Sequence, residues 1–137
     1  MLLRKIILLS ASAALCACSS GTPKALKLAL EPSGGRIDLS ESLPGEWGRV
    51  CVIPPYSTNE HASEILGIPL NIESKSSIYM LDSIALLVAM WGESVSGLFE
   101  VPRGGVDFTH LGGKCYRRGD ARFAVPERGH PFATPVF

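Results

Sequence analysis

Four cysteines are the residues of this chain best suited to covalent chemistry, and their spacing divides them into two groups. Cys16 and Cys18 stand close together near the N-terminus, whereas Cys51 and Cys115 would enclose a long loop. A zinc site usually contains closely spaced pairs such as C-x₂-C, and neither group has that spacing. For Cys51 and Cys115, the chemistry that fits is formation of a disulfide.

The three histidines have no metal-ligand spacing, because His61, His110 and His130 are widely separated in the sequence. Glu60 and Glu64 flank His61, but a solvated helix face explains that group better than a metal or acid–base site. No serine occupies a G-x-S-x-G turn, and the glycine loops match neither a phosphate-binding nor a dinucleotide-binding motif. We therefore expect no catalytic and no metal-binding residues, and a hydrolase that uses His61 or His110 is the least favoured function.

Residues 1–17 have the organisation of an export signal. Met1–Lys5 is short and basic, and Ile6–Leu15 is an apolar stretch of about ten residues, too short to span a hydrocarbon core about 30 Å thick. An ordinary cleavage site has small residues at positions −3 and −1, and cleavage after Ala17 would place the large Leu15 at −3. Another type of processing site is therefore needed.

The stretch ends in Leu15-Cys16-Ala17-Cys18, which resembles the lipobox of bacterial lipoproteins. This resemblance implies that the signal peptide is removed and that the Cys18 thiol carries diacylglycerol, and we expect no cofactor besides this covalent lipid. Acyl chains would hold the protein on a membrane, since each buried CH₂ contributes about 0.8 kcal/mol. Serine rather than aspartate follows Cys18, which favours the outer membrane of a Gram-negative cell, with the domain facing the periplasm. The alternatives are a plain signal peptide or an uncleaved anchor.

The rest of the chain has the size and charge of one small globular domain. The full sequence has 13 basic and 13 acidic residues, a formal net charge of zero and 46% hydrophobic residues. Removal of residues 1–17 takes away Arg4 and Lys5, which leaves 11 basic and 13 acidic residues and a net charge of −2. About 120 residues can form one core. The lack of a basic excess argues against a nucleic-acid partner.

Export would place Cys51 and Cys115 in an oxidising compartment, where an isolated pair of cysteines usually forms a disulfide. Closure of a loop of about 64 residues stabilises a fold by about 4 kcal/mol in the chain-entropy model. That is a large part of the roughly 5–15 kcal/mol that separates a typical folded domain from its unfolded chain. The sequence therefore predicts a structural disulfide, with a redox or metal-binding pair as the alternative.

Residues 18–45 are predicted to be the lipidated cysteine and a flexible tether with one or two short edge strands, and 46–137 a single compact domain with an extended tail. Ser57 and Glu60 fit a capping box and Gly67 fits a helix C-terminus, which predicts one short helix between them. The unbroken apolar run 84–91 predicts a buried central strand that returns through a Gly92-Glu93 turn. The other expected strands are 47–53, 78–81, 94–101, 106–108, 115–116 and 121–125. The predicted fold is therefore α+β or mostly β, with an antiparallel sheet of about five strands closed by the disulfide.

The segment from Trp47 to Tyr56 is the most distinctive in the predicted domain. A period of two places Trp47, Arg49 and Cys51 on one face of the strand. A core strand explains this pattern, and the alternative is a partner-binding surface of Trp47, Arg49 and Tyr56, because these residue types often anchor interfaces. The segment is similar to the Trp-x-Arg-hydrophobic-Cys strand, followed by Pro-Tyr, of small uncharacterised envelope lipoproteins of Gram-negative bacteria, and this resemblance implies no particular activity.

The function expected from these features is a membrane-anchored envelope lipoprotein that acts as a non-enzymatic binding or envelope-maintenance module. Its partner would be another envelope protein or peptidoglycan, apart from the membrane that holds the acyl chains. A small periplasmic inhibitor of a lytic enzyme or toxin is the alternative. The basic cluster Arg117, Arg118 and Arg122 is explained by a solvated strand edge better than by an anion site.

Overall fold

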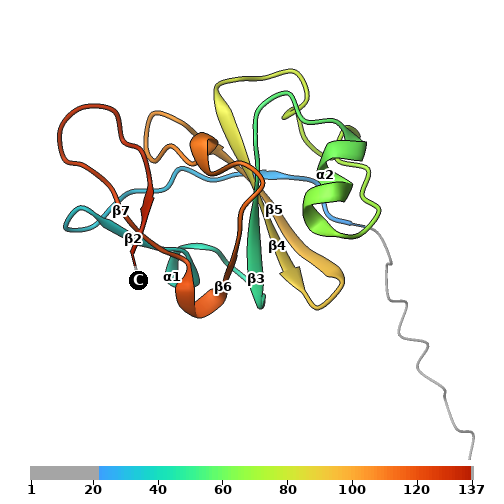
Figure 1. Cartoon of the computed structure of the whole chain (residues 1–137), viewed down its shortest axis with the longest axis horizontal. Helices are drawn as coiled ribbons and strands as arrows, with labels where there is room; N and C mark the ends of the chain where they lie inside the picture. Colours follow the sequence, from blue (N-terminus) through green and yellow to red (C-terminus); the bar gives the residue numbers. More distant parts are fainter. Residues whose placement is uncertain (1–21, 137) are drawn as a thin grey trace, which may run out of the picture.

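The computed structural model describes residues 22–136, so the predicted export signal and the predicted lipidation site Cys18 lie outside the described residues. Within these residues the chain forms two sheets and two α-helices, arranged as in Figure 1. The main sheet has the strand order β1 (Leu26–Lys27), β5 (Ser94–Pro102), β4 (Ile84–Trp91), β3 (Arg49–Ile53) and β6 (Cys115–Arg117). The small sheet has the order β2 (Arg36–Asp38), β7 (Arg122–Ala124) and β8 (Thr134–Pro135). The helices are α1 (Leu39–Ser42) and α2 (Asn59–Leu66), and η1 (Thr109–Leu111) and η2 (Arg118–Asp120) are short 3₁₀ turns.

The hairpin of β4 and β5 forms the centre of the main sheet. Its apolar strand β4 is covered on both faces, as expected for an unbroken apolar run. Gly92 turns the chain with a φ of 60°, the conformation that a two-residue II′ turn requires at its first central position. The prediction of a buried central strand and a Gly92-Glu93 hairpin is confirmed.

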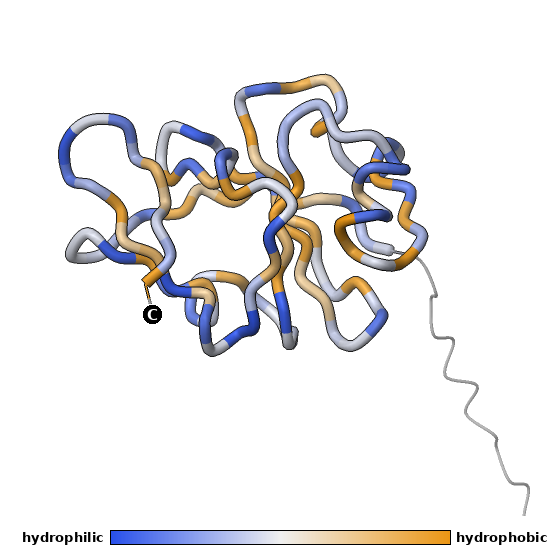
Figure 2. Tube along the Cα trace, viewed as in Figure 1, coloured by the Kyte–Doolittle hydropathy of each residue, from blue (hydrophilic) through white to orange (hydrophobic). Residues whose placement is uncertain are grey.

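Alternate residues of β4 face two separate cores. The first core lies between the main sheet and the small sheet and includes Ala85, Leu87 and Ala89. The second core lies between the main sheet and α2 and includes Leu86, Val88 and Met90. Figure 2 shows the hydrophobic residues concentrated along the crossing strands and the hydrophilic ones on the outer loops. The main sheet is thus the middle layer of three.

Helix α2 covers the second core with Ala62 and Leu66. Its N-cap is Thr58, whose side chain accepts a hydrogen bond from His61 N, so the predicted cap at Ser57 is wrong by one residue. Ser57 is instead buried, with its hydroxyl donating to Pro54 O at 2.7 Å. Gly67 ends the helix in the left-handed conformation with a φ of 73°, as predicted.

The α+β class, a sheet of five strands and the disulfide closure are confirmed, with the following corrections of detail. The main sheet is mixed, because β1 pairs parallel with β5. Residues 78–81 do not form the predicted strand: 78–80 are a turn, and the side chain of Ile78 is buried in the second core. The predicted last strand, 121–125, is found at residues 122–124 but belongs to the small sheet. The predicted strand 106–108 is not formed, and Asp107 makes only an isolated bridge to Phe132.

The folded part begins well before the predicted boundary at residue 46. Strands β1 and β2 and helix α1 all lie within the segment 18–45 that was predicted to be a tether. Buried side chains fix this segment to the first core, namely Leu30, Ile37, Leu39 and Leu43. The backbone is already held at Ala25, whose N–H donates to Lys75 O. The tether prediction is therefore wrong beyond about residue 24.

Within residues 22–136, no helix has the length and apolar character needed to cross a membrane.

Candidate functional site

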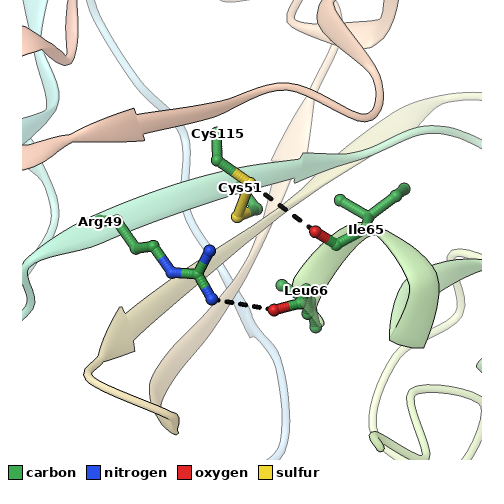
Figure 3. Close-up of a disulfide and its surroundings, with 5 residues drawn as sticks. All are labelled: Arg49, Cys51, Ile65, Leu66 and Cys115. Carbon is green, nitrogen blue, oxygen red and sulfur yellow. Dashed lines mark hydrogen bonds between the residues drawn. A yellow bond between two sulfur atoms is a disulfide. The ribbon is translucent and has the colours of Figure 1, made fainter. Parts of the chain in front are cut away.

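The predicted disulfide joins Cys51 in β3 to Cys115 in β6 (Figure 3). The two cysteines are directly opposite each other in the antiparallel register, so the bond closes a pair that the sheet has already brought together. Cys115 Sγ lies 3.9 Å from Ile65 O in α2. This is a van der Waals contact and not a hydrogen bond, because a disulfide sulfur has no hydrogen to donate. The pair therefore has a structural position at the boundary of sheet and helix.

Two of the three predicted partner-binding residues are used by the fold. Trp47 precedes β3 and is 1% exposed in the first core, so it lies on the face opposite Cys51 and cannot anchor a partner. The guanidinium of Arg118 covers its ring at 4.8 Å, which also accounts for one member of the basic cluster. Arg49 Nη2 donates to Leu66 O at 2.9 Å and so holds the C-terminus of α2 against the sheet (Figure 3).

Tyr56, the third predicted anchor, is 61% exposed and has a φ of 62°. Among the described residues it is the one non-glycine residue with positive φ. It follows Pro54 and Pro55 in the turn between β3 and α2, and its N–H donates to Ile78 O at 2.8 Å. A bulky side chain in this conformation is strained, and such strain is concentrated at functional sites.

His61 has a neighbouring hydroxyl but no arrangement that would activate it. Ser57 Oγ lies 3.1 Å from His61 Nδ1, and the same Oγ donates its proton to Pro54 O. Ser57 is also buried by the turn. A serine nucleophile needs its proton directed at the base and its oxygen open to substrate, so this pair is best understood as part of the turn.

The fold brings His110 and His130 to one aromatic side chain. The ring of Phe132 lies 5.0 Å from that of His110 and 4.3 Å from that of His130. This convergence was not predicted, because η1 and the C-terminal segment meet only through tertiary contacts. Among residues 22–136, no three His, Cys, Asp or Glu side chains gather in a group that could hold a metal ion.

Beneath these rings, a fully buried aspartate ties the loop after β5 to the C-terminal segment. Asp107 Oδ1 accepts from Thr109 N at 2.8 Å and Thr109 Oγ1 at 2.6 Å, and Oδ2 accepts from Arg103 Nε at 2.9 Å and contacts His130 Nε2 at 2.6 Å. Burial by itself raises the pKa of Asp107, but the hydrogen bonds from Thr109, His130 and Arg103 outweigh it and lower the pKa to about 2. Asp107 is therefore an ionised structural group, and Asp107 with its three partners is called the Asp107 cluster below.

The small sheet carries a hollow of about 390 Å³ with charged walls, called the charged hollow below. Its lining comes from the segment before β2, from β2, α1 and β7, and from the end of the described chain: Glu31, Ser33, Arg36, Ile37, Asp38, Glu41, Ser42, Arg122, Phe123 and Val136. Another hollow of about 470 Å³ is lined mainly by glycine and proline, with Glu127 as the one charged residue of its described lining. The charged hollow is the better candidate, because binding sites combine concave shape with several convergent polar groups.

Two arginines stand on one face of the small sheet at this hollow. The register pairs Arg36 with Ala124 and Asp38 with Arg122, so Arg36 and Arg122 are diagonal neighbours on adjacent strands. Diagonal neighbours in an antiparallel sheet are about 7–8 Å apart, within reach of long side chains. The ion pairs found within residues 22–136 are both at Asp107, so neither arginine has a carboxylate at salt-bridge distance there.

The carboxylates of the charged hollow differ in how they are engaged. Asp38 is the N-cap of α1, and its Oδ1 accepts from Ser40 N at 2.9 Å and from Ser40 Oγ at 2.6 Å. Glu31 and Glu41 are exposed and make no side-chain hydrogen bond with the described residues. The hollow thus presents two guanidinium groups and two carboxylates to solvent, an arrangement that complements a ligand carrying both signs of charge.

Comparison of this chain with protein-family models, with curated proteins and with solved structures finds no match. The function is therefore argued from the site itself. Sequence analysis missed Arg36, Glu31 and Glu41 because they lie in the predicted tether. It interpreted Arg122 as a solvated residue at a strand edge. For Arg36, the available signal was the alternation of Ile37 and Leu39, which indicates a strand around that residue.

Proposed function

We propose that this protein is a lipoprotein of the bacterial cell envelope, anchored in the outer membrane by acyl chains on Cys18 and facing the periplasm. Its folded domain is a non-enzymatic binding module, and the charged hollow is its binding site. The lipobox-like sequence supports the anchor, and the convergence of Arg36, Arg122, Glu31 and Glu41 supports the binding site. The Asp107 cluster and the Ser57–His61 pair have structural roles in this proposal.

One observation carries the proposal: the start of the described chain and the charged hollow are at opposite ends of the molecule. In Figure 1 the described part of the chain begins beside α2, and β2 and β7 lie at the far end of the long axis. Only seven peptide units separate Cys18 from Ala25, the first residue held by the fold, and they span at most about 25 Å. A lipid on Cys18 would keep the α2 end near the membrane and turn the charged hollow towards the periplasm.

The test follows acylation and partner capture in the same cells. We expect Cys18→Ala to abolish labelling by a radioactive fatty acid and to release the protein from the membrane fraction. We expect an Arg36→Ala/Arg122→Ala double variant to keep its acyl chains but lose its cross-links to envelope components. The matched control is Arg117→Ala, an exposed arginine of the main sheet that does not line the hollow. Continued labelling of Cys18→Ala, or unchanged cross-links in the double variant, would contradict the proposal.

A second function, inhibition of a periplasmic lytic enzyme, is favoured by Tyr56. Its turn joins the disulfide-bearing strand β3 to α2, and it exposes a strained aromatic residue on a rigid support. Inhibitors that bind rigidly lose little conformational entropy on association. If this function is correct, the full chain inhibits purified cell-wall hydrolases and Tyr56→Ala abolishes the inhibition. Inhibition that survives Tyr56→Ala would exclude this turn as the inhibitory element.

A further inference from the structure

We propose that the ligand of the charged hollow is a short peptide that carries a free carboxylate and a free ammonium group close together, as the stem peptides of peptidoglycan do. This inference rests on the proposed function, because it names the partner of the same site. A stem peptide with a diamino acid offers both charges within one or two residues. The hollow offers the complementary charges on the segment before β2, on α1 and on the short strands β2 and β7.

The carboxylate is recognised by Arg36 and Arg122. They stand diagonally on β2 and β7, and their side chains can close on one carboxylate from two sides. Guanidinium groups bind carboxylates through two parallel hydrogen bonds, which gives both strength and orientation. Within residues 22–136 no carboxylate already occupies them, since Asp38, directly opposite Arg122, is held by Ser40.

The ammonium group is recognised by Glu31 and Glu41. Both are exposed at the hollow, and they approach it from the segment before β2 and from α1. Glu31 precedes β2 and Glu41 belongs to α1, whereas the arginines belong to β2 and β7, so the two charges of the ligand meet different elements. A ligand with only one of the two charges leaves either the arginines or the glutamates without a partner, so the hollow discriminates against neutral or singly charged peptides.

The size and position of the hollow select a short peptide of the cell wall over a folded protein. A volume of about 390 Å³ is in the range of small-ligand sites, roughly 300–1,000 Å³, and is small for a protein interface. A domain tethered by its α2 end presents this hollow away from the membrane, in the direction of the cell wall. Half-buried Val136 provides an apolar contact for the aliphatic part of such a peptide.

In the experiment, a purified stem tripeptide that ends in a diamino acid is titrated into the full-length, acylated protein in detergent micelles. Calorimetry measures the binding. We expect saturable binding that weakens at least tenfold in Arg36→Ala/Arg122→Ala and in Glu31→Gln/Glu41→Gln. Arg117→Ala is expected to bind like the unmodified chain. Chemical amidation of the peptide's carboxylates should weaken binding as much as the arginine substitutions, and acetylation of its amine as much as the glutamate substitutions. Circular dichroism and thermal unfolding establish that each variant is folded.

Several outcomes would overturn the inference, and they differ from those that overturn the proposed function. Absence of binding to the stem tripeptide, or equal binding of the amidated peptide, refutes the ligand. Binding of the C-terminal peptide of an envelope protein without binding of the stem tripeptide does the same, but it leaves a binding module in place. Acylation of Cys18 is measured separately, by fatty-acid labelling, so a protein that is not acylated in cells but binds the tripeptide refutes the anchor alone.

Discussion

The two faces of the main sheet are closed by different chemistry. On the α2 face, a covalent bond between Cys51 and Cys115 joins neighbouring strands, and Arg49 fastens the helix above them. On the opposite face, no covalent bond holds the small sheet among the described residues, and the ionised carboxylate of Asp107 ties the chain after β5 to the C-terminal segment. One face is therefore sensitive to reduction of its disulfide, and the other to acid below about pH 4.

This difference separates a stabilising region from the region of the proposed binding site. The disulfide acts on the unfolded chain and leaves no polar group buried. The Asp107 cluster keeps a charge in the interior and satisfies it with four contacts, from Thr109, Arg103 and His130. The charged hollow is on the small sheet, the layer that relies on this polar closure and on apolar packing. Its geometry should therefore respond to changes at Asp107 more than to reduction of the disulfide.

The largest expected effect comes from removing the covalent closure. A Cys51→Ala/Cys115→Ala variant should lose about 4 kcal/mol of unfolding free energy, because the loop of about 64 residues gains freedom in the unfolded chain. Urea denaturation measures the loss. Reduction of the unmodified chain is the matched control, since it opens the bridge but keeps both side chains. A loss below about 1 kcal/mol in both cases would mean that the unfolded chain is already compact.

The next effect tests the polar closure. Asp107→Asn should lower the unfolding free energy by about 3 kcal/mol, because an amide nitrogen then faces the donors of Arg103 and His130. This loss of unfolding free energy is near the lower limit of the range for a broken buried ion pair. The side chains of Arg103 and His130 are 35% and 46% exposed, so they can form hydrogen bonds with water instead. Asp82→Asn is the control, because Asp82 is exposed and uses only its carbonyl group to accept from Arg103. If Asp107→Asn and Asp82→Asn lose similar amounts of unfolding free energy, the hydrogen bonds of the Asp107 carboxylate do not stabilise the fold specifically.

The same cluster predicts a loss of stability in acid. The pKa of Asp107 falls from 3.8 to about 2 on folding, so its contribution is complete above about pH 4 and is lost as the pH falls towards 2. The shift corresponds to about 2 kcal/mol. Unfolding free energies of the wild type and of Asp107→Asn should therefore converge over this range. Parallel pH profiles would show that other carboxylates cause the acid sensitivity.

The two faces also differed in how far the sequence could predict them. The disulfide, the apolar strand β4, the Gly92 turn and the Gly67 end of α2 all depend on local residue types, and each was predicted. The small sheet was missed because β2 is three residues long and pairs with β7, which lies more than 80 residues further along the chain. The segment was predicted to be part of a tether with one or two short edge strands, and β2 finds its partner only in the distant strand β7.

The candidate site was missed for the same reason. Arg36 and Arg122 have ordinary surface residue types, and nothing local indicates that they share one face. The buried Asp107 likewise lies in a glycine-rich loop, where an aspartate usually suggests a turn. In contrast, Trp47 drew attention through its residue type and is a core residue. Residue type alone therefore predicted the face closed by the disulfide better than the face that carries the proposed binding site.

A smaller effect is expected on the α2 face, where Tyr56 connects β3 to the helix. Tyr56→Asn should raise the unfolding free energy by about 1 kcal/mol, because asparagine tolerates a φ of 62° better than an aromatic residue. Thermal and urea denaturation measure the gain, and Tyr79→Asn, another exposed tyrosine with negative φ, is the control. If Tyr56→Asn destabilises the domain, the ring of Tyr56 packs in solution and its strain is compensated locally.

The smallest effect concerns β6, which contributes to both faces. Cys115 points towards α2, and Tyr116 points into the first core, where its ring packs edge to face on Phe123 at 5.0 Å. The Tyr116 hydroxyl is buried without a hydrogen-bond partner among the described residues, and burial raises its pKa. Tyr116→Phe removes this unsatisfied group and keeps the ring contact, so we expect a gain of about 0.5 kcal/mol in urea denaturation. A loss of stability would mean that a bound water satisfies the hydroxyl, and that the polar closure of this face extends beyond Asp107 to β6.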